Sequence, residues 1–149
     1  MKKVLLLLFT LCITLAAKSQ IYSYTFVETL SSSSEEVTFT YKVFCPQKKS
    51  IDQAGYLAGL RCVIFDGIPG TMFSKPLLSE GEKTSVSKNQ SYFDDLYYNR
   101  ISDFAKDCYM ISKFKKSGDN QSTLFQITVK ASMLRKDLEK NNIKTRMGI

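Results

Sequence analysis

The stretch Val37-Thr38-Phe39-Thr40-Tyr41-Lys42-Val43-Phe44-Cys45 decides the fold of this chain. Apolar residues stand at every second position, with threonine or lysine between the first four of them. This period of two is typical of a β-strand that buries one face. Residues 21–30 are also rich in aromatic and β-branched residues, and the serine-rich run 31–35 separates the two segments. We therefore predict a β-hairpin whose second strand ends at Pro46.

A helix is predicted directly after this hairpin. Ser50 is a suitable N-cap, and apolar residues then recur at spacings of three and four, at Ile51, Ala54, Ala58, Cys62 and Phe65. Gly55 and Gly59 each lower helix propensity by up to ~1 kcal/mol relative to alanine. Their presence indicates that the helix backbone lies very close to a neighbour, which we expect to be the sheet.

The second half of the chain predicts further elements of both kinds. We expect an amphipathic helix over residues 91–106, strands over 108–116 and 123–131, a short helix that Ser132 caps, and a loose tail. The order strand, strand, helix, helix, strand, strand, helix predicts an α+β domain. Its single antiparallel sheet would have about four strands, with two to three helices packed mainly on one face.

The first 19 residues are typical of a cleaved secretory signal peptide. Two lysines precede the apolar run 4–17, which is shorter than the ~20 residues of a membrane-spanning helix. We predict cleavage before Gln20, no transmembrane segment afterwards, and one domain over residues 20–149. The compact signal looks bacterial, so we expect the protein in the periplasm, at the outer membrane or in the medium. Lipidation at Cys12 is the alternative, although the bulky Leu11 precedes it.

Basic residues concentrate in the last third of the chain. Cleavage would remove three lysines and no acid, which lowers the net charge of +7 by three. We predict a basic patch formed by Lys113, Lys115, Lys130, Arg135 and Lys136. Such a patch attracts anionic lipid, polysaccharide or nucleic acid, and export makes nucleic acid the least favoured of these. A merely solvated face is the alternative, because acids are interspersed.

Three cysteines remain after cleavage, namely Cys45, Cys62 and Cys108, so at most one internal disulfide is expected. The helix that begins near Ser50 would carry Cys62 beyond bridging distance of Cys45, because bridged Cα atoms lie within ~7 Å. Any disulfide should therefore involve Cys108. Three buried thiols are the alternative interpretation.

A long irregular segment is predicted at residues 67–90, after consecutive Asp-Gly and Pro-Gly turn signals. Loops of this length in a compact domain are usually binding segments or mobile excursions. The candidate partner-binding residues are Asp66, Gly67, Ile68, Pro69, Gly70 and Phe73.

The sequence predicts no catalytic residues, no cofactor and no metal site. It contains no histidine, which removes the usual general base near neutral pH and every histidine-dependent nucleophile or metal site. The cysteines lack the close spacing of a zinc or redox motif, and no phosphate-binding loop is present. Carboxylates at 66, 80, 82, 94 and 95 are the acids available for glycosidase-type chemistry.

Two stretches resemble a known group of envelope domains. These are the small-residue helix at 51–65 and the strand that runs directly into a leucine helix at 127–138. Their pattern resembles the amino-terminal domain of the flagellar assembly protein T and related small envelope lipoproteins. The lipid-accepting cysteine of that group is missing here, and the segment 71–90 is longer. The resemblance implies a non-enzymatic part of an envelope assembly.

These observations favour an exported, non-enzymatic binding or assembly component of the bacterial cell envelope, whose partner is another envelope or extracellular protein. The first alternative is a secreted inhibitor or immunity-type protein that inserts the 67–90 loop into an extracellular enzyme. The second is an enzyme that uses carboxylates or a cysteine.

Overall fold

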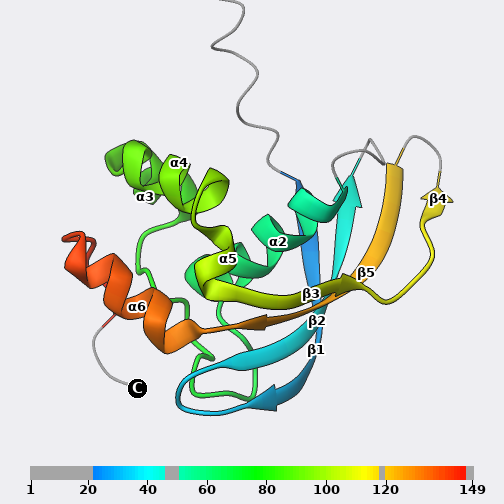
Figure 1. Cartoon of the computed structure of the whole chain (residues 1–149), viewed down its shortest axis with the longest axis horizontal. Helices are drawn as coiled ribbons and strands as arrows, with labels where there is room; N and C mark the ends of the chain where they lie inside the picture. The colour runs from blue at the N-terminus through cyan, green and yellow to red at the C-terminus, as the bar shows by residue number, and fades with distance from the viewer. Residues whose placement is uncertain (1–21, 46–50, 118–119, 147–149) are drawn as a thin grey trace, which may run out of the picture.

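The predicted α+β class is confirmed by the computed structural model, which describes residues 22–45, 51–117 and 120–146. One antiparallel sheet has the strand order β1-β2-β5-β3, and β4 pairs with β5 beside β3 (Figure 1). The sheet has five strands where about four were expected: β1 (Ser23–Ser32), β2 (Val37–Cys45), β3 (Ala105–Met110), β4 (Lys115–Ser117) and β5 (Asn120–Val129). The predicted signal peptide, Pro46 and Ser50 lie outside the described residues.

The hairpin and the inward face of its second strand were predicted correctly. Val37, Phe39, Tyr41 and Val43 are fully buried. The inward faces of β2 and β5 meet in register, pairing Val37 with Val129, Phe39 with Ile127 and Tyr41 with Phe125. These aromatic and β-branched pairs form the centre of the core.

Five helices are described, together with one π-helical turn, η2 (Cys62–Asp66), that continues the first of them. They are α2 (Ile51–Arg61), α3 (Glu82–Lys88), α4 (Gln90–Tyr98), α5 (Ile101–Phe104) and α6 (Ala131–Lys140). Helix α2 contacts β2, β3 and β5, while α3, α4 and α6 gather at one end of the molecule (Figure 1). No helix in the described ranges is both long and apolar enough to cross a lipid bilayer.

The close approach predicted for the two helical glycines is confirmed. A Cβ atom on Gly55 would lie 2.6 Å from Cε1 of Phe125, and one on Gly59 would lie 2.6 Å from Cδ1 of Ile127. Both distances are shorter than real Cβ contacts. Glycine therefore lets α2 lie directly on the side chains of β5.

The predicted helix over 91–106 ends earlier than expected. Helix α4 stops at Tyr98, α5 is a separate short turn, and Ala105 already pairs with Val129 in the sheet. The strand expected over 108–116 thus begins at Ala105 and is interrupted by a bulge at Asp107, where φ is 53°. Pairing with β5 overrides the helical pattern of this segment.

Two segments expected to be irregular are ordered by tertiary contacts. Helix α3 occupies part of the predicted 67–90 loop, because Glu82 pairs with Arg61 of α2 through two hydrogen bonds of 2.6 Å. The tail expected to be loose packs onto the domain: Ile143 is 5% exposed, and Thr145 forms a β-bridge with Leu78. Both predictions of irregular structure were therefore wrong for these residues.

Candidate functional site

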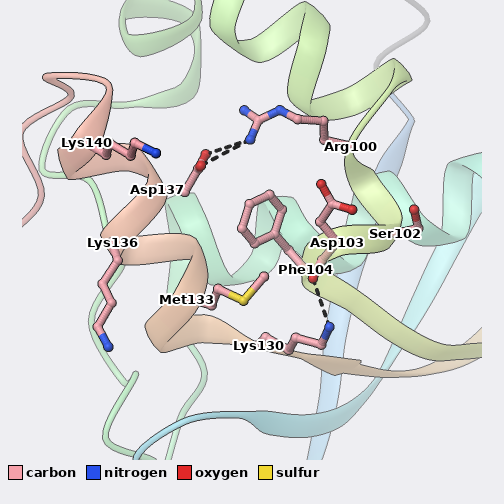
Figure 2. A pocket seen from close by; sticks show the side chains of 9 residues that line it. All are labelled: Arg100, Ser102, Asp103, Phe104, Lys130, Met133, Lys136, Asp137 and Lys140. Atoms are coloured by element: carbon pink, nitrogen blue, oxygen red, sulfur yellow. Dashed lines mark hydrogen bonds and ion pairs between the residues drawn. The ribbon is translucent and has the colours of Figure 1, made fainter.

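A basic groove lies between α5 and α6, with a volume of about 520 Å³ and a wide opening to solvent (Figure 2). This volume lies within the range of ordinary ligand clefts. We call it the α5–α6 groove. Four of its lining residues are basic and two are acidic; the full lining is Arg100, Ser102, Asp103, Phe104, Lys130, Met133, Lys136, Asp137 and Lys140.

One wall of this groove is formed by residues on one face of α6. Met133, Lys136, Asp137 and Lys140 recur every three or four residues along α6, so they share one face of the helix. Lys130 stands at the junction of β5 and α6, where its Nζ donates a hydrogen bond of 3.0 Å to the backbone carbonyl of Asp103. That contact joins the two walls at the base of the groove (Figure 2).

The opposite wall depends on Arg100, which is held between two carboxylates. Its Nη1 donates to both carboxylate oxygens of Asp137 at 3.1 Å, and its Nε donates to Asp95 at 2.5 Å. The guanidinium also lies over the rings of Tyr92 and Phe104. Arg100 is thus engaged on several sides, and its main role here is to connect α4, α5 and α6.

This network shifts the pKa values of its members. Partial burial opposes the charge on Arg100, but the hydrogen bonds with Asp95 and Asp137 outweigh it and raise the pKa of the guanidinium. Burial, followed by its hydrogen bond to Asp137, raises the pKa of the Tyr92 hydroxyl well above its ordinary value. The hydrogen bonds from Asn99 and Arg100 lower the pKa of Asp95. Every shift keeps the ordinary charge state near neutral pH.

The lysines differ from Arg100 in their contacts. Among the described residues, no carboxylate lies within 4.0 Å of Nζ of Lys130, Lys136 or Lys140. Lys136 and Lys140 are exposed and lie one turn apart on α6. Their charges are therefore available to an anion that enters the groove.

The predicted basic patch is divided by the structure. Lys130 and Lys136 line the α5–α6 groove, whereas Lys113 and Lys115 lie just before and within β4, at the opposite end of the molecule (Figure 1). Arg135 is not among the lining residues, and its Nε is buried without a hydrogen-bond partner in the described part of the chain. The single five-residue patch was therefore wrong, because β4 and α6 extend from opposite ends of β5.

The prediction missed Arg100 and Lys140 as groove residues. Lys140 follows Lys136 by four positions on one helix, so this spacing could have identified Lys140 as a neighbour of Lys136 on the same face. Arg100 gave no such signal, because its position depends on the break between α4 and α5.

Half of the residues predicted to form a partner-binding loop are buried, among them both large apolar side chains. Ile68 is fully buried, Phe73 is 3% exposed and Gly67 is buried against the backbone of residues 74–75. The carboxylate of Asp66 accepts a hydrogen bond of 2.6 Å from Tyr24. Pro69 and Gly70 are exposed, but the apolar residues expected to contact a partner face inward.

Cys62 and Cys108 are free thiols, so the one disulfide that the sequence allowed, which would have involved Cys108, is not formed. Cys62 is buried in the core, as the alternative interpretation predicted, and Sγ of Cys108 lies 3.5 Å from Oη of Tyr41. Burial raises the pKa of the Cys108 thiol to about 11. The side chain of Cys45 lies outside the described residues.

Several of the carboxylates considered for catalysis are engaged in structural contacts. Glu82 pairs with Arg61, Glu80 with Lys88, and Asp95 with Arg100. Within the described ranges, no group of three potential metal-ligating side chains comes together.

Comparisons with protein-family models, with curated proteins and with solved structures find no match to this chain. The resemblance to small envelope domains therefore stays a prediction.

Proposed function

We propose that this chain is an exported, non-enzymatic binding or assembly component of the bacterial cell envelope, and that the α5–α6 groove is its contact surface. The observation that carries this proposal is the group of three lysines around the groove without a carboxylate partner among the described residues. Export is supported by the amino-terminal pattern of lysines and apolar residues.

A binding role fits the chemistry of the groove better than catalysis does. Asp137 accepts hydrogen bonds from Arg100 and Tyr92, and so its oxygens are occupied by donors. Asp103 is exposed, in a groove that is open to water. With Asp137 occupied, the lysines are the main charged groups left to meet a ligand, which favours recognition of an anionic partner.

The groove replaces the 67–90 loop as the proposed contact surface. Burial of Ile68 and Phe73 removes the apolar anchors that a loop needs to insert into a target. The inhibitor interpretation depended on that loop and loses its main support with it.

Site-specific photo-crosslinking in cells of the source organism tests this function. A crosslinking residue replaces Met133, which lines the groove and is 44% exposed. The matched control replaces Met72, which lies in the 67–81 segment and is 48% exposed. We expect an adduct with one identified envelope protein from position 133 and none from position 72. An adduct only from position 72, or from neither position, would contradict the proposal.

A further inference from the structure

We propose that the occupant of the α5–α6 groove is an extended acidic segment of a partner protein. In this segment one residue separates two acidic residues, and an apolar residue follows two positions after the second. This inference rests on the proposed function, and it names the chemistry of the partner.

The first argument is charge. Arg100 and Asp137 pair with each other, so the charges that remain around the groove are those of three lysines and Asp103. Lys136 and Lys140 are exposed and carry the surplus of positive charge. An anionic ligand is complementary to this wall, and it would also be attracted before contact.

The second argument is spacing. Lys136 and Lys140 are four residues apart on α6, which separates their Cα atoms by roughly 6 Å along the helix axis. In an extended peptide, side chains on the same face recur every two residues, at roughly 6.6 Å. Two acidic residues with one residue between them therefore match the two lysines. A peptide in this conformation would lie along α6.

The third argument is the apolar part of the groove. Met133 lies one turn before Lys136 on the same face, and it is 44% exposed although it is apolar. Phe104 lines the groove beside it and is only 3% exposed. Methionine adapts its shape to different apolar partners. The next same-face residue of an extended peptide would reach Met133, so we expect that residue to be apolar.

The fourth argument distinguishes a peptide from a small anion or a lipid surface. Asp103 is exposed on the α5 wall, and no basic side chain within the described ranges lies within 4.0 Å of its carboxylate. That carboxylate repels anionic groups of every kind, including the acidic side chains of a peptide, but a peptide also has backbone N–H groups that can donate a hydrogen bond to it, which inorganic phosphate lacks.

Fluorescence anisotropy with the purified protein tests this inference. The probe is a labelled peptide with the core Glu-Ser-Glu-Ser-Leu in a Gly/Ser context, together with the same core in reversed order. Controls carry Ser for both Glu residues, or Ser for Leu. We expect saturable binding of at least one acidic peptide, at least tenfold weaker binding of the peptide without Glu, and clearly weaker binding of the peptide without Leu.

Two matched double variants locate the binding. We expect K136E/K140E to weaken binding at least tenfold, and K113E/K115E, which changes the net charge equally at the β4 end, to stay within twofold of the unchanged protein. We expect K136Q/K140Q to show a smaller but clear loss of peptide binding. Because it removes the charges without reversing them, it controls for a folding defect caused by charge reversal. Equal losses in both charge-reversed variants would overturn the inference, because they would show attraction by net charge alone.

Other anions separate the failure of this inference from the failure of the proposed function. Binding of phosphatidylglycerol vesicles or of inorganic phosphate, lost in K136E/K140E, with no binding of either acidic peptide, would overturn the acidic segment but keep the groove as a contact surface. If position 133 gives no crosslink and none of these anions binds, the proposed function is overturned as well.

Discussion

Asp137 of α6 accepts hydrogen bonds from Nη1 of Arg100 through both carboxylate oxygens, each at 3.1 Å. One of these oxygens also accepts a hydrogen bond of 2.8 Å from Tyr92. Because Arg100 follows α4 and precedes α5, this pair connects α6 to both helices beside the α5–α6 groove (Figure 2).

The first expectation concerns this pair. Asp137→Asn removes the charge that Arg100 faces in α6, and hydrogen bonds to charged groups contribute about 1.5–3 kcal/mol. Since both side chains are partly exposed, we expect a loss of about 1–2 kcal/mol in the free energy of unfolding, measured with urea. Asp94→Asn, on the exposed face of α4, is the control. Unchanged stability of Asp137→Asn would contradict the assigned role.

The second expectation concerns the close contact between α2 and β5. Gly55→Ala places a methyl group against the buried ring of Phe125, and overpacking of this kind costs about 1–3 kcal/mol. The gain in helix propensity, up to ~1 kcal/mol, offsets only part of it. Thermal unfolding should therefore show a lower Tm. In the control Gln53→Ala, at an exposed position of the same helix, stability should change by less than about 0.5 kcal/mol.

The third expectation concerns the thiol of Cys108. Burial raises its pKa from the ordinary value of 9.0 to about 11, which lowers the thiolate fraction at pH 8 about a hundredfold. Because a thiolate of higher pKa is also more nucleophilic, iodoacetamide labelling, followed residue by residue with mass spectrometry, should be at least about tenfold slower in the folded protein than in urea. Equal rates in the two conditions would contradict the burial of this side chain.

The same shift has a consequence for stability. The folded state holds the Cys108 proton more tightly than the unfolded state does, so this thiol contributes stability below pH 9. That contribution is lost as the pH rises from about 9 to about 11. Cys108→Ala should reduce the loss of stability over this range, relative to the unchanged protein.

The fourth expectation concerns the carboxyl-terminal segment. Ile143 is 5% exposed, and the neighbouring backbone pairs with residues 77–78. Ile143→Ala should lower the free energy of unfolding by about 2–4 kcal/mol in a urea titration. Met72→Ala, at a position that is 48% exposed, should change it by less than about 0.5 kcal/mol. Similar values for the two variants would indicate that the segment is not packed as described.

Local patterns were sufficient to predict the class of the fold. The alternation from Val37 to Val43 identified the inward face of β2, and two glycines in one helix indicated its contact with the sheet. The end of α5 at Phe104 could not be predicted in this way, because Ala105 is drawn into the sheet by its pairing with Val129. Helix α3 likewise depends on the contact of Glu82 with Arg61, which is 21 residues away.

The candidate site could be predicted only in part, for the same reason. Lys130 and Lys136 were identified as basic surface residues, but the sequence does not show that β4 and α6 lie at opposite ends of the molecule. Arg100 reaches the groove only through the turn between α4 and α5. The apolar residues of the predicted loop, Ile68 and Phe73, contribute to the core, and hydrophobicity alone does not distinguish a core residue from a contact residue.

The most direct test of the central claim is a charge swap between the groove and its ligand, measured by anisotropy. The protein K136E/K140E is titrated with the peptide in which both Glu residues are replaced by Lys, and the four combinations of protein and peptide are compared. Our account requires tight binding for the two complementary combinations and at least tenfold weaker binding for the two like-charged ones. Equal affinities in all four combinations would show that Lys136 and Lys140 do not contact the acidic residues.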